Sequence, residues 1–151
     1  AVSAKFHARF NAKGKVYRYH LHLGAADPFE VNYCWSLNRE LDWPAVLAAA
    51  KVLRGRHDFW AFSGENDRTY ETTVRDLRRL DVGKKGKRVT FTFEADGFIY
   101  KMARSLTGAL VNVGLGKLTP ADLAVLIKSR KRIPMVVTAP PQGLFLVKVI
   151  Y

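Results

Sequence analysis

The chain contains 151 residues, 48% of them hydrophobic, which suits one compact domain with a buried core. Its 25 lysines and arginines against 13 acidic residues give a net charge of +12, and this charge indicates a polyanionic partner. One cysteine excludes an internal disulfide, and the sequence has neither an apolar run long enough for a bilayer nor a secretory signal pattern. We therefore expect a single domain over residues 1–151, in the cytoplasm, with no membrane association.

The first predicted elements are a strand over residues 15–23 and a helix that begins after Asp42. Aromatic and β-branched residues alternate with more polar ones in the strand. The helix tolerates Pro44 in its first turn and ends before Gly55.

The segment that follows this helix places His57 beside Asp58, an adjacency that could suggest acid–base chemistry. Consecutive side chains diverge, however, so the two are poor partners for one another. We interpret the segment instead as a helix end that anchors Phe59 and Phe62 in the core.

The second half of the chain opens with two β-rich runs, residues 73–82 and 88–94. Glycines and lysines at residues 83–87 suit a tight and solvated connection, so the two runs predict a hairpin with a basic tip. The remaining predicted elements are a helix over residues 98–113, a helix that begins at Thr119 and a strand over residues 144–150.

The order of these elements is strand, helix, hairpin, two helices and strand. It predicts an α+β fold, with a mainly antiparallel sheet and helices on one face. The other face is then left for a ligand or partner.

Arg104 is unusual in the helix predicted for residues 98–113, because it falls on the side opposite the apolar stripe. Lys101, Ser105 and Gly108 lie near it on that side. A glycine inside a helix costs about 1 kcal/mol relative to alanine, so close approach of another group would explain Gly108. An ordinary solvated arginine is the alternative interpretation.

Tyr17 and Tyr19 share one surface of the first strand, and Arg18 takes the other. An aromatic pair beside cations can stack an unpaired base. Packing of at least one tyrosine against a helix is the alternative.

Other basic residues could contact phosphate or lie on a solvated surface. His7 and Arg9 flank Ala8 near the start of the chain, and Arg75 lies in the predicted hairpin. A further group of cations follows the last helix: Lys128, Arg130, Lys131 and Arg132.

The sequence contains no complete active site. Asp96 precedes Gly97 and is typical of a turn residue that caps the following helix. We find no phosphate-binding glycine loop, no serine or cysteine nucleophile motif and no metal-ligand spacing, so no cofactor or metal is expected.

Several segments, in their order and spacing, together resemble one family. They are residues 6–12, 17–19, 55–59, 97–98 leading to 102–104, Gly108, 113–114, 138–140 and 143–144. Their sequences, apart from the single glycine, are FHARFNA, YRY, GRHDF, GF, MAR, VG, TAP and GL. Across nearly the whole chain they are similar to the tRNA pseudouridine synthase A family.

This resemblance implies two similar α/β halves joined into a continuous sheet, with a basic cleft that accepts the anticodon arm of tRNA. The chain resembles the carboxy-terminal half. The family isomerises uridine to pseudouridine without metal or cofactor and forms homodimers. Its essential aspartate belongs to an Arg-Thr-Asp loop of the other half, which these residues do not contain. We therefore expect the chain alone to be inactive; a non-catalytic RNA-binding module of the same fold is the alternative.

The resemblance also assigns roles to residues. Tyr17 resembles the tyrosine that stacks on the target base and is a candidate for proton removal. Arg104 resembles the arginine that pairs with the catalytic aspartate, and Leu144 resembles part of the pocket wall. From the residue patterns and the resemblance together, the residues expected to contact substrate RNA are His7, Arg9, Tyr19, Arg75, Lys101 and Leu144.

Overall fold

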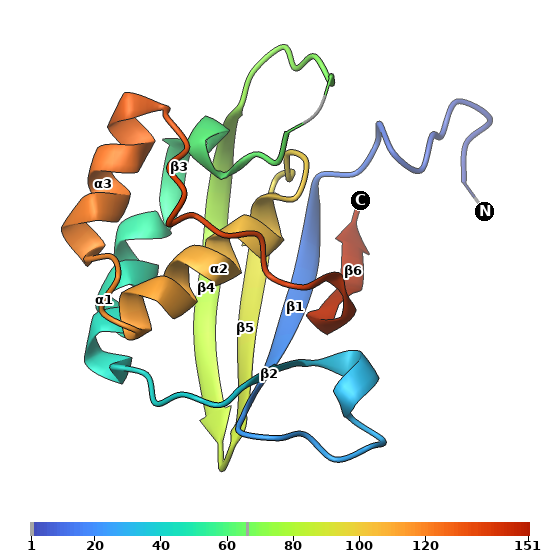
Figure 1. Ribbon diagram of the computed structural model, residues 1–151. Helices are drawn as coiled ribbons and strands as arrows, with labels where there is room; N and C mark the ends of the chain where they lie inside the picture. Colours follow the sequence, from blue (N-terminus) through green and yellow to red (C-terminus); the bar gives the residue numbers. More distant parts are fainter. Residues whose placement is uncertain (1, 66) are drawn as a thin grey trace.

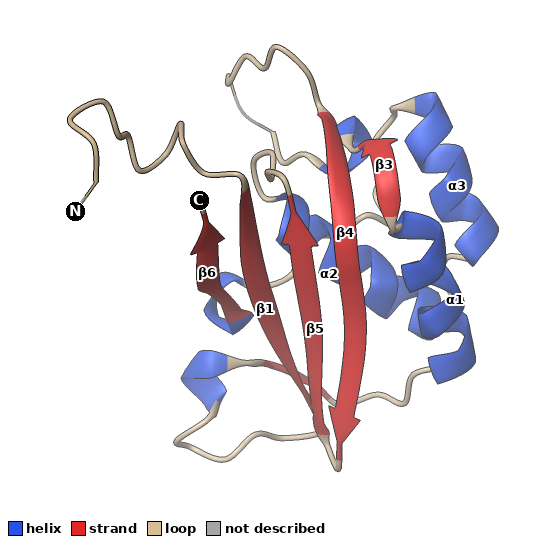
Figure 2. Cartoon of the chain, turned by 180° about the vertical axis from the view of Figure 1, so that it is seen from behind, coloured by secondary structure: helices blue, strands red, loops and turns tan. Residues whose placement is uncertain are grey.

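A computed structural model describes residues 2–65 and 67–151. In this part of the chain, a six-stranded sheet is covered on one face by three helices (Figures 1 and 2). The strands are β1 (Gly14–Leu23), β2 (Trp35–Leu37), β3 (Gly55–Asp58), β4 (Val74–Lys85), β5 (Arg88–Ala95) and β6 (Leu144–Ile150). The helices are α1 (Trp43–Leu53), α2 (Met102–Gly114) and α3 (Pro120–Ser129), with short 3-10 turns η1 (Val31–Tyr33), η2 (Trp60–Phe62) and η3 (Pro141–Gly143).

The sheet order is β2-β1-β5-β4-β3, and β6 also pairs with β1. Only the β1–β2 pair is parallel among the pairings of the described residues. The predicted α+β class, with a mainly antiparallel sheet and helices on one face, is therefore confirmed.

Strand β1 lies inside the sheet, between β5 on one side and β6 with β2 on the other. Tyr17 is opposite Phe93 and Tyr19 is opposite Phe91. Both phenylalanines are fully buried, so this register turns the two tyrosines toward the helices. The pairing with β6 has an irregularity between Val16 and Tyr17.

Helix α1 begins as predicted, because the Asp42 carboxylate accepts a hydrogen bond from the Ala45 amide and a proline stands in the first turn. Gly55, with a φ of 107°, follows the helix and opens β3. The sequence-based interpretation missed this strand, because four residues without apolar alternation carry no strand signal and pairing with β4 defines them. The predicted burial of Phe59 and Phe62 is confirmed.

The predicted hairpin is present, but its tip is shorter than expected. Gly83, Lys84 and Lys85 continue β4 by pairing with β5, and only Gly86 and Lys87 form the turn. Two-residue hairpin turns favour residues with a left-handed backbone, and Gly86 has that conformation, with a φ of 60°.

Helix α2 begins at Met102, four residues later than predicted. Residues 98–101 form a turn instead, and Lys101 has a φ of 58°, which is a left-handed conformation that a helix cannot contain. Asp96 therefore does not cap this helix. Its side chain accepts a hydrogen bond from the Asp76 amide in β4 at 2.9 Å, so the expected structural role takes a different form.

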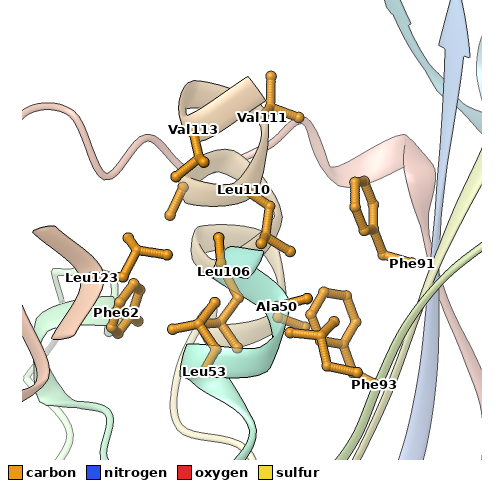
Figure 3. Packing of buried hydrophobic residues seen from close by; sticks show 14 of the residues in the cluster. Ala50, Leu53, Phe62, Phe91, Phe93, Leu106, Leu110, Val111, Val113 and Leu123 are labelled. Carbon is orange, nitrogen blue, oxygen red and sulfur yellow. The ribbon is translucent and has the colours of Figure 1, made fainter. Parts of the chain in front are cut away.

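The core is centred on α2, which is buried along its length except at Arg104. Leu106 and Leu110 belong to the same buried cluster as Leu53 of α1 and Phe93 of β5, whose packing Figure 3 shows. Helix α3 flanks this layer and begins with the predicted cap, where Thr119 and Asp122 exchange side-chain and backbone hydrogen bonds.

Candidate functional site

A polar cleft of about 1060 Å³ opens between the N-terminal segment, β1, residues 67–75 and the turn that precedes α2. Its lining combines cations and aromatic rings, with fewer carboxylates than cations. The cations are Arg9, Lys15, Arg68, Arg75 and Lys101, the aromatic residues are Phe10, Tyr17, Tyr70, Phe98 and Tyr100, and the carboxylates are Asp67 and Asp96. The cleft is thus a positive and aromatic surface, the combination that binds unpaired nucleotides.

Several of these cations lie on aromatic faces. The Arg68 guanidinium carbon is 4.5 Å from the centre of the Tyr100 ring, and the Lys101 ammonium is 5.0 Å from it. The Tyr70 hydroxyl accepts a hydrogen bond from the Tyr100 amide, which links the two walls of the cleft. Cation–π contact orders these long side chains before any ligand arrives.

Tyr17 is half-buried in the cleft, and its ring meets Phe98 edge-on with centroids 4.9 Å apart. Burial raises the pKa of its phenol. The Tyr17 side chain therefore keeps its proton at neutral pH, because the ordinary pKa of tyrosine is already about 10.

Tyr19 is fully buried, and its hydroxyl donates a hydrogen bond to the Pro140 carbonyl at 2.7 Å. Burial also raises the pKa of this phenol, an effect that the positive charge of Arg104 partly opposes. This position does not fit the expectation that Tyr19 contacts RNA, because a base cannot stack on an inaccessible ring. Core packing, the alternative that the sequence left open for one tyrosine, is the role of Tyr19.

Arg104 is held by a segment that crosses the outer side of α2, residues 133–140, which we call the strap. The Arg104 Nε–H donates to the Ala139 carbonyl at 2.7 Å, and the Ala139 amide donates back to the Arg104 carbonyl at 3.1 Å. A Cβ placed on Gly108 would lie 1.9 Å from the Val137 carbonyl oxygen. The predicted close approach to this side of the helix is confirmed, and Arg104 is not an ordinary solvated arginine.

Leu144 follows the strap at the start of β6 and pairs with Tyr19 in β1. It is half-buried against the core. Just before it, Gly143 packs on the Tyr19 ring, where an added Cβ would lie 2.6 Å from the ring carbon that bears the hydroxyl. Leu144 and Arg104 are thus connected through the strap and Tyr19.

His7 does not line the cleft. Its Nδ1 lies 3.2 Å from the Arg9 amide and 3.3 Å from the Phe10 amide, from which it accepts hydrogen bonds. It therefore shapes the segment that carries Arg9. Of the residues expected to contact RNA, the structure gathers Arg9, Arg75 and Lys101 around Tyr17.

The sequence-based interpretation missed Arg68, Tyr70 and Tyr100 in the cleft. A signal was present, since Arg68 and Tyr70 alternate and Tyr100 is adjacent to Lys101. This mixture of aromatic and cationic residues in loops is typical of surfaces that bind unpaired nucleotides.

A second hollow, of about 550 Å³, lies between η1 and the hairpin tip and contains none of the catalytic or RNA-contacting residues expected from the sequence. In the ranges 2–65 and 67–151, no three His, Cys, Asp or Glu side chains are grouped as metal ligands. Over the same ranges, no helix has the length and apolar character needed to cross a membrane.

The fold and the cleft together define an α+β domain with a positive and aromatic cleft. A family model described as tRNA pseudouridine synthase matches residues 49–151. The chain therefore belongs to the tRNA pseudouridine synthase family, and the resemblance noted in its sequence is confirmed.

Individual relatives support the same assignment over almost the whole chain. The tRNA pseudouridine synthase A 1 of Protochlamydia amoebophila is 37% identical over 153 residues, which cover 99% of this chain and 60% of that protein. The tRNA pseudouridine synthase A of Thermoanaerobacter sp. is 38% identical, with 99% and 62% covered, and that of Geobacillus kaustophilus is 38% identical, with 99% and 58% covered. The chain thus spans about three-fifths of the length of these curated relatives.

Proposed function

We propose that this chain is the carboxy-terminal half of a tRNA pseudouridine synthase and isomerises uridine in the anticodon arm once an aspartate-bearing half completes it. The observation that carries the proposal is the way Arg104 is held. Its Nε–H is engaged by the strap, and among the described residues no side chain or carbonyl takes up its two terminal nitrogens. A fixed guanidinium with free donors is suited to a carboxylate supplied from outside the chain.

In this arrangement Arg104 acts on the nucleophile rather than on the uridine. An aspartate beside a cation keeps a low pKa and stays ionised, as a nucleophile must. The bonded Nε also sets the direction of the terminal N–H groups, which would orient that carboxylate. Arg104 is therefore proposed to be essential for turnover and minor for RNA affinity.

Tyr17 is proposed to stack on the target base through its ring. During the isomerisation the base leaves the ribose through nitrogen and rejoins it through carbon, so that carbon must lose a proton and the released nitrogen must gain one. Tyr17 can remove the carbon-bound proton only as a phenolate. Burial opposes this form, so catalysis by Tyr17 should become faster as pH rises.

The remaining cleft residues are proposed to bind the RNA backbone. Arg9, Arg75 and Lys101 supply positive charge in the cleft that Tyr17 also lines. His7 supports Arg9 through its backbone contacts. Leu144, which packs against the core and does not line the cleft, is proposed to add an apolar wall in the completed enzyme. The intact enzyme is proposed to be a homodimer that works in the cytoplasm, where its tRNA substrate is found.

The test is conversion of uridine in a tRNA transcript by the full-length protein that carries this chain. Wild-type protein should form pseudouridine in the anticodon arm, and Arg104→Ala should bind the same tRNA but form none. An equal loss of binding and turnover would instead assign Arg104 to RNA binding. A full-length protein that binds tRNA but converts no uridine would support the alternative, a non-catalytic RNA-binding module with the same cleft.

A further inference from the structure

We propose that Arg132 is a positioning residue for Arg104, because its guanidinium fixes the strap that holds the Arg104 side chain. This inference rests on the proposed function of Arg104. In the sequence, Arg132 belongs to a basic group after the last helix that could have been a solvated surface or a phosphate track. The structure places it between α2 and the strap instead.

The Arg132 guanidinium joins three segments of the chain. Its Nη1 group donates to the Ser63 carbonyl and to the Ser105 hydroxyl, both at 3.0 Å. Its Nη2 group donates to the Val136 carbonyl at 2.8 Å and to the Thr138 hydroxyl at 2.9 Å. One terminal nitrogen of Arg132 therefore binds α2 and the segment after η2, and the other binds the strap.

The acceptors around Arg132 are neutral carbonyl and hydroxyl groups. Burial of the Arg132 side chain disfavours its charge and lowers its pKa, which Glu65 partly offsets. A half-buried cation without a hydrogen-bonded carboxylate is stable only if its donors are well satisfied. The planar fork of arginine can satisfy four acceptors in this arrangement, whereas a lysine presents its three donors from a single nitrogen.

The strap transmits this constraint to Arg104 over a single peptide bond. Thr138, which Arg132 binds, is followed by Ala139, which exchanges two hydrogen bonds with Arg104. Movement of the strap toward α2 is blocked by the contact between Gly108 and the Val137 carbonyl. Movement away would break the bond to the Arg104 Nε–H, so the position of the strap decides the direction of the Arg104 guanidinium.

The first test does not depend on catalysis. Hydrogen exchange of the Arg104 Nε–H, followed by NMR in the intact chain, should become about tenfold faster in Arg132→Lys, because the strap opens more often. Arg39→Lys, a change at an exposed arginine outside the strap, should leave this exchange rate unchanged. An unchanged Arg104 signal in a folded Arg132→Lys protein would overturn the proposal.

The second test is a double-mutant cycle in the full-length enzyme. Arg132→Lys should lower kcat about tenfold to a hundredfold and leave the KM for tRNA within about twofold, as expected for an effect through a misdirected group. In an Arg104→Lys background, which already lacks the Nε–H donor, Arg132→Lys should add little further loss. Additive losses, or a rise in KM alone, would show that Arg132 acts by another route.

A third pair of variants keeps the inference testable if Arg132→Lys does not fold. Thr138→Val and Ser105→Ala each remove one acceptor of Arg132 and keep the other three. Thr138→Val should accelerate Arg104 Nε–H exchange more than Ser105→Ala, since only Thr138 belongs to the strap. Equal effects would contradict the proposed route. If wild-type enzyme forms no pseudouridine, the proposed function fails while the exchange result still decides whether Arg132 holds the strap.

Discussion

Arg104 and Ala139 hold each other through two hydrogen bonds, one from the arginine Nε–H to the Ala139 carbonyl and one from the Ala139 amide to the Arg104 carbonyl. The first bond directs the side chain and the second ties the strap to the backbone of α2. The guanidinium is therefore aligned before substrate binds, and its orientation depends on a segment that lies far from it in the sequence. Alignment of this kind lowers the reorganisation that a reaction requires.

Gly108→Ala should destabilise the protein, although alanine favours a helix by about 1 kcal/mol over glycine. The new methyl group would overlap the Val137 carbonyl, and such overpacking costs about 1–3 kcal/mol. Chemical denaturation measures the change in the free energy of unfolding. Gly83→Ala is the control, because the nearest atom to its added Cβ is 3.8 Å away. Wild-type stability in Gly108→Ala would mean that the strap does not rest on α2.

Tyr19→Phe should lower the free energy of unfolding by about 1 kcal/mol, because it removes the hydrogen bond to the Pro140 carbonyl. The affinity for tRNA should not change, since the ring is fully buried. Denaturation and tRNA binding measured on the same preparation check both statements. If Tyr19→Phe has wild-type stability but binds tRNA more weakly, the result would show that Tyr19 contacts RNA.

Tyr17→Phe should lower kcat by about a hundredfold or more, because it keeps the ring but removes the group proposed to take the proton. Its affinity for tRNA should stay close to that of the wild type. Tyr17→Leu also removes the stacking surface and should weaken binding by about 1–3 kcal/mol. Single-turnover rates and binding isotherms separate these effects.

The turnover rate of the wild-type enzyme should rise with pH above neutrality. Burial raises the pKa of Tyr17, and only the deprotonated form can accept a proton, so the active fraction increases as pH approaches that pKa. Tyr17→Phe should lose this rise. A flat profile in the wild type would assign proton removal to another group.

Lys101→Ala should weaken tRNA binding and reduce the slope of log Kd against log salt by about one, as expected for one lost phosphate contact. Lys101 lines the cleft, whereas Lys51 is an exposed lysine in the last turn of α1. Lys51→Ala is therefore the matched control and should keep the wild-type slope. If the two variants have equal slopes of log Kd against log salt, Lys101 does not contact the phosphates of the RNA.

His20 should make the protein less stable in mild acid. Burial and the nearby charges of Arg18 and Arg88 lower the pKa of His20 below its unfolded value of about 6.5. The stability that His20 contributes is fully present above the unfolded pKa and is lost as pH falls through the lower folded pKa. Over that range the unfolded state binds the proton more readily than the folded state does. Melting temperatures at pH 7.5 and pH 5 should differ less in His20→Gln than in the wild type. An identical difference in the two proteins would show that His20 does not contribute.

Local patterns in the sequence were sufficient for much of the fold. The cap at Asp42, the capping pair at Thr119 and Asp122 and the β-rich runs of the hairpin all act over a few residues, and the structure contains each of them. The family resemblance also came from the sequence, and through it Tyr17 and Arg104 were singled out. Both assignments of catalytic role stay predictions until turnover is measured.

Tertiary structure decided what depends on partners distant in the chain. Pairing with β4 defined β3, and the left-handed backbone at Lys101 delayed the start of α2. Burial separated the two tyrosines of one strand face, leaving Tyr17 in the cleft and Tyr19 in the core.

Arg104 shows most directly what the sequence alone could predict and what required the tertiary structure. Its helical position was enough to indicate that something approaches its side of α2. The identity of that group could not be predicted, because Ala139 lies 35 residues away and carries only backbone donors and acceptors, which every non-proline residue shares. The sequence also could not distinguish Arg132 from the surface cations beside it. Its four acceptors come from three separate segments, which only the folded chain brings together.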